Sequence, residues 1–179
     1  TGLMVVAKSG YVHNLLRRML HTPQFRREYR AVCLGRPEPA VGVIDAPIGR
    51  DLSSTVRRCI RPDGARAVTH YEVLGTEDGL SLLRLRPETG RTHQLRVHMA
   101  SIGCPLAGDW LYGREDPDLI PRPALHAYAL ELDHPVTGKH LSLTAPIPSD
   151  MARLVPGLLA ETACAGEKID HKIGGDSLC

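Results

Sequence analysis

One stretch of the chain decides the fold that we expect for it: Arg84-Leu-Arg-Pro-Glu-Thr-Gly-Arg-Thr-His-Gln-Leu-Arg-Val-His-Met-Ala-Ser-Ile-Gly103. An apolar, strand-like run over residues 80–85 reaches a Pro-Glu-Thr-Gly turn, after which Thr92 can cap a helix that Gly103 ends. One face of that helix is apolar, because its large apolar side chains recur at spacings of four and three: Leu95, Met99 and Ile102. The stretch therefore predicts a strand, a turn and an amphipathic helix in succession.

The entry turn of this predicted helix is crowded with basic groups, namely Arg91, His93 and Arg96. A helix N-terminus already carries partial positive charge from its unpaired amides, so these groups repel one another unless an anion is present. The pattern favours a site for a phosphate or a carboxylate. The alternative is that the arginines are ordinary solvated surface residues.

The flanking segments supply further elements. The apolar run at residues 2–8 predicts a buried strand, and Ser9 can cap a helix that Pro23 ends. Residues 25–35 read as a strand on which Tyr29 lies beside several arginines, and residues 36–64 as an irregular basic excursion with a short strand at 41–44.

Two hairpins and a short helix complete the pattern. Residues 67–74 and 80–86 flank a Gly-Thr-Glu-Asp-Gly turn, and residues 125–133 and 139–144 flank a His-Pro-Val-Thr-Gly turn. A short helix is expected over residues 149–154. Strands outnumber helices and occur in adjacent pairs, so we predict an α+β fold with a mostly antiparallel sheet and flanking helices.

Length and composition indicate one domain. The chain has 179 residues and 42% hydrophobic content, enough for a single core, which we assign to residues 1–160 with a polar tail at 161–179. It contains no run of about 18 apolar residues, so no membrane span is expected. Its five cysteines are odd in number and scattered, which favours a reduced, cytoplasmic compartment.

Charge is distributed unevenly along the chain. Residues 1–96 contain 16 Lys or Arg against 9 Asp or Glu, whereas residues 97–179 contain 6 against 11. Most of the basic residues are arginine, whose planar fork of donors binds phosphate and stacks on bases. The basic half suggests nucleic acid as a partner, and the alternative is a solvated basic face.

Several classes of chemistry lack support. The chain has no nucleophile elbow, no Walker loop and no glycine-rich dinucleotide motif. Asp109 follows Gly108 in a turn, which is typical of a residue that caps backbone amides. His93 and His98 are five residues apart and do not share a helix face, which disfavours a zinc site. Tyr29 could hold a base against arginines, or it could be a core tyrosine with a satisfied hydroxyl.

A set of ordered motifs resembles the RluA-type pseudouridine synthases, and the match runs from Thr1 to about Leu154. The upstream part comprises Arg27-Glu-Tyr-Arg-Ala31, Pro47-Ile48 and Ala67-Val-Thr-His-Tyr71. The downstream part comprises Arg86-Pro-Glu-Thr-Gly-Arg-Thr-His-Gln-Leu-Arg-Val-His-Met99, Gly103-Cys-Pro-Leu-Ala-Gly-Asp-Trp-Leu-Tyr-Gly113, Leu125-His-Ala127 and His134-Pro135.

The resemblance implies a cofactor-free enzyme with the fold of a pseudouridine synthase catalytic domain, which isomerises uridine to pseudouridine in RNA. In that family Tyr29 matches the tyrosine that packs on the target uracil, and Arg96 matches the arginine that pairs with the essential aspartate. Leu130 matches an apolar residue of the base pocket. We also expect Arg91 and His93 to contact the substrate.

The same resemblance predicts that the essential aspartate lies about three residues before Thr1, in a His-Arg-Leu-Asp motif, so these 179 residues alone are expected to be inactive. The predicted partner is ribosomal or transfer RNA, with no membrane association and a monomeric enzyme. Two alternatives stay open: an RNA-binding module that has lost its chemistry, and an inactive partner subunit.

Overall fold

The computed structural model describes residues 1–20 and 22–158. The predicted tail at 161–179 and the end of the assigned domain lie outside these residues. The elements follow one another as α1 (Gly10–Met19), β1 (Phe25–Leu34), β2 (Val41–Asp45), β3 (Ile48–Arg50), β4 (Arg58–Ile60), β5 (Val68–Glu77), β6 (Leu80–Pro87), α2 (Gln94–Ser101), β7 (Leu125–Asp133), β8 (His140–Thr144) and α3 (Ser149–Ala152).

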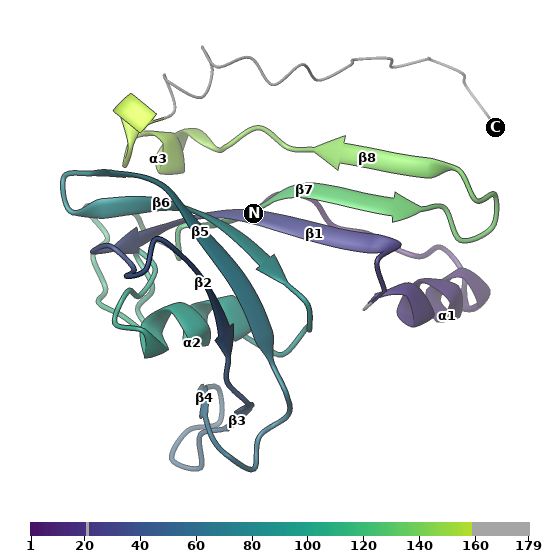
Figure 1. The fold of residues 1–179 in the computed structure, drawn as a ribbon, viewed down its shortest axis with the longest axis horizontal. Helices are drawn as coiled ribbons and strands as arrows, with labels where there is room; N and C mark the ends of the chain where they lie inside the picture. The colour runs from purple at the N-terminus through teal and green to yellow at the C-terminus, as the bar shows by residue number, and fades with distance from the viewer. Residues whose placement is uncertain (21, 159–179) are drawn as a thin grey trace.

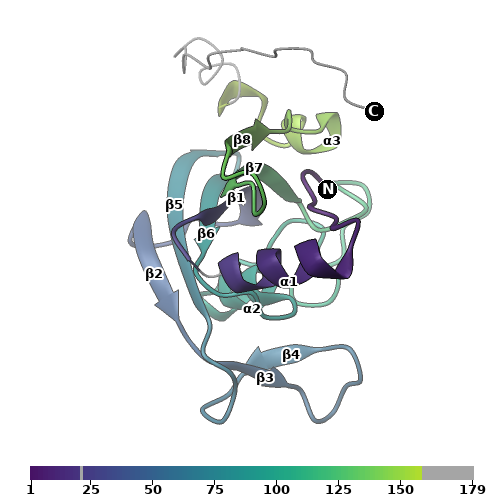
Figure 2. The same ribbon diagram turned by 90° about the vertical axis from the view of Figure 1, so that its right-hand side faces the viewer.

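Six strands form one antiparallel sheet in the order β2-β5-β6-β1-β7-β8, while β3 and β4 pair as a separate ribbon. Both α1 and α2 lie on one side of the sheet and α3 lies on the other (Figure 1). The ribbon of β3 and β4 extends away from the sheet (Figure 2). The predicted α+β class with an antiparallel sheet is confirmed.

The central strand β1 divides the core between the two faces of the sheet. Ala31 and Cys33 pack with Leu95 and Met99 of α2 on one face. Val32 points to the other face, where it packs with a cluster that includes Met151 of α3. Alternation of side chains along β1 therefore places residues 29, 31 and 33 on the face that carries α2.

The first helix forms as its sequence predicts. The side chain of Ser9 accepts a hydrogen bond from the Val12 amide, and two arginines occupy the last turn, where cations are favourable. Leu16 and Met19 of α1 pack on the apolar cluster around Phe25. The sequence pattern and the packing agree because both depend on one apolar helix face.

The prediction of a buried strand over residues 2–8 is wrong. Only Gly2 forms a bridge, to Ala127, and Leu3 packs against the cluster of Phe25. Beyond that point the segment leaves the sheet, so the side chains of Met4 and Val6 are 84% and 75% exposed. An apolar run becomes a buried strand only where neighbouring strands continue beside it, and here the pairing stops after one bridge.

The helix of the central stretch begins later than predicted. Thr92 does not cap it; α2 starts at Gln94, and His93 precedes it in a left-handed conformation with no side-chain cap. Gln94 instead fixes the turn, because its side chain accepts hydrogen bonds from the Arg91 amide and the Thr89 hydroxyl. Gly103, at a φ of 77°, ends the helix as predicted.

The segment predicted to be an irregular excursion contains a regular element. Besides the expected short strand β2, the strands β3 and β4 pair antiparallel over residues 48–50 and 58–60. Each strand has three residues, which is too short for an alternating pattern to stand out in the sequence. Among residues 1–20 and 22–158, no helix is long and apolar enough to cross a membrane.

Candidate active site

Arg96 of α2 is held by a carboxylate within the chain. Its Nε donates to Asp109 Oδ2 and its Nη2 donates to Asp109 Oδ1, both at 2.7 Å. The Asp109 side chain is fully buried and that of Arg96 is 15% exposed. This fork-to-fork pair has the geometry in which arginine and carboxylate bind most strongly, and the hydrogen bonds to Asp109 raise the pKa of Arg96.

Asp109 also performs the capping role predicted for it. Its Oδ1 accepts hydrogen bonds from the amides of Leu111 and Tyr112, at 3.1 and 3.2 Å. The pairing with Arg96 is a role that the sequence analysis missed. The basic groups at the helix entry had predicted an anion there, and Asp109 supplies that anion for Arg96.

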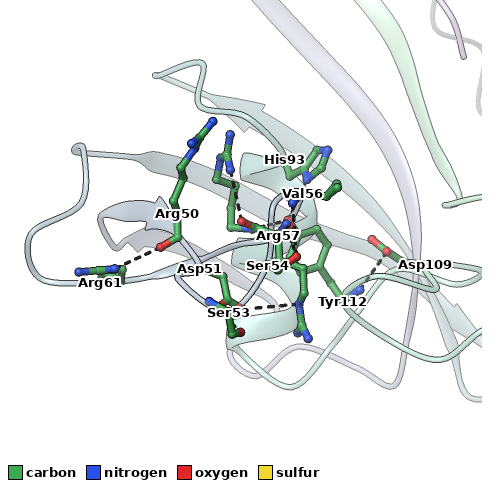
Figure 3. A network of polar contacts seen from close by, with 11 residues as sticks. Arg50, Asp51, Ser53, Ser54, Val56, Arg57, Arg61, His93, Asp109 and Tyr112 are labelled. Carbon is green, nitrogen blue, oxygen red and sulfur yellow. Dashed lines mark hydrogen bonds and ion pairs between the residues drawn. The ribbon is translucent and has the colours of Figure 1, made fainter.

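Tyr112 joins the helix entry to the ribbon of β3 and β4 (Figure 3). Its hydroxyl accepts a hydrogen bond from the Arg58 amide at 2.9 Å and lies 2.8 Å from His93 Nδ1. The guanidinium carbon of Arg96 lies 5.0 Å from the centre of the Tyr112 ring, within the range of a cation–π contact. Burial and the neighbouring Arg96 and Arg58 lower the pKa of His93, which favours the neutral imidazole.

Tyr29 lies on the face of the sheet that carries α2, half-buried against the cluster of Leu95 and Met99. Its hydroxyl makes no hydrogen bond to any other residue that the structure describes. Tyr71, in the same cluster, shows the ordinary arrangement of a core tyrosine, since it is 6% exposed and its hydroxyl donates to Pro39 O at 3.1 Å. Tyr29 thus lacks the satisfied hydroxyl that a core tyrosine normally has.

The other predicted site residues, Leu130 and Arg91, lie in different parts of the fold. Leu130 is buried beside Phe25 under α1 and pairs across the strands with Arg27, next to Tyr29 along the sheet. The guanidinium of Arg91 donates to the Arg66 carbonyl at 2.9 Å and the residue is exposed. The structure therefore brings His93 close to Arg96 through Tyr112, and Tyr29 to the cluster of Leu95 and Met99, whereas Leu130 belongs to the separate cluster of Phe25.

The first residues of the chain lie close to Tyr29. Gly2 bridges Ala127 of β7 in a parallel arrangement, and Ala127 pairs with Tyr29 on its other side. Two strand spacings, about 10 Å, therefore separate Gly2 from Tyr29 across the sheet. Gly2 has a φ of 96°, and a Cβ there would lie 2.3 Å from the Ala127 carbonyl oxygen, so only glycine allows this close approach.

Comparison with known proteins identifies the family. The family model described as RNA pseudouridylate synthase matches residues 1–101. The chain is 43% identical over 157 residues to an uncharacterized RNA pseudouridine synthase, YjbO, of Bacillus subtilis, covering 88% of this chain and 55% of that protein. The chain belongs to the RNA pseudouridylate synthase family.

Further pseudouridylate synthases agree with this result and with the RluA-type resemblance. Ribosomal large subunit pseudouridine synthase D of Nitrosomonas europaea is 46% identical over 166 residues, which cover 88% of this chain and 48% of that protein. The solved structure of human RNA pseudouridylate synthase domain containing 4 aligns with a TM-score of 0.68 at 26% identity, covering 87% of this chain and 72% of that chain. The chain spans about half the length of these curated relatives.

Two side chains on one side of the sheet, Arg96 and Tyr29, have polar atoms without a hydrogen-bond partner among the described residues. Arg96 donates from Nε and Nη2 to Asp109, which fixes the guanidinium. Its Nη1 makes no hydrogen bond to another described residue. Tyr29 presents a ring that is partly exposed and a hydroxyl that is not used. A flat ring suits the face of a base, and a free guanidinium nitrogen suits an additional oxygen ligand.

Proposed function

We propose that the protein converts uridine to pseudouridine in RNA, with large-subunit ribosomal RNA as its substrate. In this isomerisation the bond between N1 of uracil and C1′ of ribose breaks, the base turns, and C5 bonds to C1′. C5 then loses its proton and N1 gains one, so no cofactor is consumed. The single observation that carries the proposal is the half-buried Tyr29, whose ring and unused hydroxyl lie on the sheet face of α2.

We assign each group a role in this reaction. Tyr29 packs on the uracil, Leu130 contributes the apolar wall beside it, and Arg96 orients the catalytic carboxylate through its Nη1. Arg91 and His93, at the entry to α2, contact the RNA. The protein acts as a monomer in the cytoplasm.

The carboxylate nucleophile belongs, in this proposal, to a residue that precedes Thr1 in the complete protein. The bridge from Gly2 to Ala127 supports this placement, because Ala127 is the strand partner of Tyr29 and the first residues of the chain therefore lie two strands from Tyr29. The relatives are about twice as long as the matched segment, so they contain additional sequence. The 179-residue chain alone is accordingly expected to bind RNA without isomerising it.

A second candidate is an RNA-binding module with the same fold and no chemistry. One observation favours it: Asp109 already satisfies two nitrogens of Arg96, so the arginine is stable without a catalytic carboxylate. The two candidates differ in one measurable product. Purified complete protein is incubated with unmodified large-subunit ribosomal RNA, and pseudouridine is mapped by carbodiimide labelling and primer extension. New pseudouridine at a defined position supports the enzyme, and unmodified RNA that still binds supports the module.

A further inference from the structure

A basic cleft opens where β1 separates from β6. The register between the two strands starts at Tyr29 and Leu85, although β1 begins at Phe25 and β6 continues to Pro87. Residues 25–28 therefore pair with β7 alone, and the ends of β5 and β6 bend away from β1 (Figure 1). The resulting cleft has a volume of about 680 Å³ and is bounded by the C-terminal end of α1 on one side.

Charged side chains line this cleft, and nearly all of them have partners within the chain. Arg86 contacts Glu28 at 2.6 Å, and His70 contacts Glu88 at 2.6 Å. Two further arginines have carboxylates at longer range: Arg66 lies 3.7 Å from Glu88, and Arg26 lies 3.9 Å from Glu131. The acidic lining residues are thus already engaged.

Arg27 differs from these four residues. No carboxylate of the described residues lies within ion-pair distance of it, and its Nε is buried without a hydrogen-bond partner. Its polar contact is a long hydrogen bond, 3.4 Å, from Nη2 to the Thr89 carbonyl. Leaving a buried cationic donor unsatisfied costs free energy, so this position is suited to an anion from outside the described chain.

The motif around Arg27 shows that its neighbours on the strand serve the fold. Glu28 and Arg30 alternate with Arg27 and Tyr29 along β1 and pair with each other, Glu28 also binding Arg86 at the cleft. The Arg30 guanidinium lies 4.1 Å from the centre of the Tyr128 ring. Arg27 and Tyr29 both have polar groups without partners. Two residues of extended chain, about 7 Å, separate them, which is within the reach of one nucleotide.

We propose that Arg27, in the cleft between β1 and β6, is a binding site for a backbone phosphate of the RNA next to the nucleotide held by Tyr29. This inference rests on the proposed function, since it assumes that the base lies on Tyr29. Arg27 lines the cleft, and its guanidinium is a planar fork of donors, the arrangement with which arginine binds phosphate bidentately. The phosphate takes the place of the carboxylate that Arg27 lacks.

The test measures binding of a short oligouridylate to the complete protein as a function of salt. Arg27→Gln keeps much of the side-chain length and removes the charge. It should weaken binding about tenfold and lower the slope of log affinity against log salt by about 0.7, because one phosphate contact is lost. Arg27→Lys should keep the slope and recover part of the affinity. Thermal melting checks that both variants fold.

Arg36→Ala is the matched control. It removes the same charge from an exposed arginine that pairs with Glu38 at 3.2 Å, nine residues along from Arg27. Seven residues of β1, about 23 Å, lie between Arg27 and the end of the strand at Leu34, which Arg36 follows. The Arg36 charge is thus about two Debye lengths from the cleft at ordinary salt, so the slope should not change. An equal change of slope in Arg36→Ala and Arg27→Gln would overturn the site.

A second arm distinguishes a phosphate from a carboxylate of the protein itself. Single phosphates of the oligouridylate are replaced in turn by neutral methylphosphonates. At one position this replacement should weaken binding to the wild type and leave binding to Arg27→Gln unchanged. Two results would show that Arg27 has only a structural partner. In the first, every methylphosphonate weakens binding to Arg27→Gln as much as it weakens binding to the wild type. In the second, Arg27→Gln loses stability while the salt slope of its RNA binding stays the same.

The outcomes also separate this inference from the proposed function. Pseudouridine formation with an unaltered salt slope in Arg27→Gln retains the enzyme and rejects the phosphate site. A reduced slope without pseudouridine formation by the wild type retains the site and rejects the enzyme.

Discussion

Arg96 and Asp109 face each other with two hydrogen bonds of 2.7 Å, and the carboxylate is completely buried. The pair connects α2 to the turn after Gly108. The same carboxylate accepts hydrogen bonds from the amides of Leu111 and Tyr112 in that turn. A residue expected to serve catalysis is thereby also part of the core. Variants at these two positions should accordingly separate stability from activity.

Asp109→Ala should destabilise the protein strongly. Removal of one partner leaves the largely buried Arg96 charge uncompensated, a loss of about 3–5 kcal/mol in the free energy of unfolding. The matched control is Asp150→Ala, which removes an aspartate that also pairs with an arginine at 2.7 Å but is 29% exposed, and should cost about 1 kcal/mol or less. Urea unfolding of both variants measures the difference, and equal losses would contradict the importance of burial.

Arg96→Lys should lower turnover by about a hundredfold, because an ammonium cannot contact Asp109 through two parallel donors and still present a third nitrogen in a fixed direction. Single-turnover formation of pseudouridine by the complete protein measures this effect. Arg122→Lys, which alters the arginine paired with Asp150 on the α3 side, should leave turnover at the wild-type level. Unchanged turnover in Arg96→Lys would remove Arg96 from the mechanism.

Tyr29→Ala should reduce kcat/KM because the base loses its stacking partner, a contribution of about 1–3 kcal/mol. Tyr29→Phe retains the ring, so it should keep that contribution and report separately on the hydroxyl, which has no partner among the described residues. Steady-state assays on the complete protein compare the two variants. If Ala and Phe behave alike, stacking is not the function of this ring.

Tyr112→Phe should loosen the ribbon of β3 and β4 without changing the core. The Arg58 amide loses its acceptor and His93 Nδ1 loses its neighbour, at a cost of about 1 kcal/mol. Hydrogen exchange at residues 57–60 should become faster, while exchange in β1 and β6 stays at the wild-type rate. Uniform acceleration in all strands would mean that the hydroxyl supports global stability rather than the ribbon.

His98 should make the protein less stable in acid. Burial lowers its pKa below the usual 6.5, and its ring nitrogens lie 2.9 Å from the Thr69 hydroxyl and 3.0 Å from the Ala46 carbonyl oxygen. The unfolded chain binds the proton more readily than the folded protein. The stability that neutral His98 contributes to the free energy of unfolding is therefore fully present above pH 6.5. It is lost as pH falls from there toward the folded pKa, by up to about 1.4 kcal/mol per pH unit.

Urea unfolding at pH 5.5 and pH 7.5 checks this expectation. His98→Gln should show a smaller difference between the two pH values than the wild type, whereas His13→Gln, on the exposed side of α1, should match the wild type. A His98→Gln protein with an unchanged pH dependence would assign the acid sensitivity to other groups.

Local patterns predicted most of the elements because their causes lie within a few residues. The Ser9 cap, the apolar face of α1 and the Gly103 stop all depend on neighbours in the chain, and each is present in the structure. The prediction over residues 2–8 failed because an apolar run does not show whether a strand lies beside it. The ribbon of β3 and β4 was missed because three-residue strands carry too little periodicity.

The sequence by itself determined the antiparallel α+β class, the helix caps, the hairpins and, through its long ordered motifs, the family. Only the tertiary structure decided that Asp109 neutralises Arg96, that Gly2 joins the sheet beside Ala127, and that Arg27 lacks a carboxylate among the described residues. The physical reason is distance along the chain. Capping and periodicity act between near neighbours, whereas these pairings arise only when the sheet brings remote segments together.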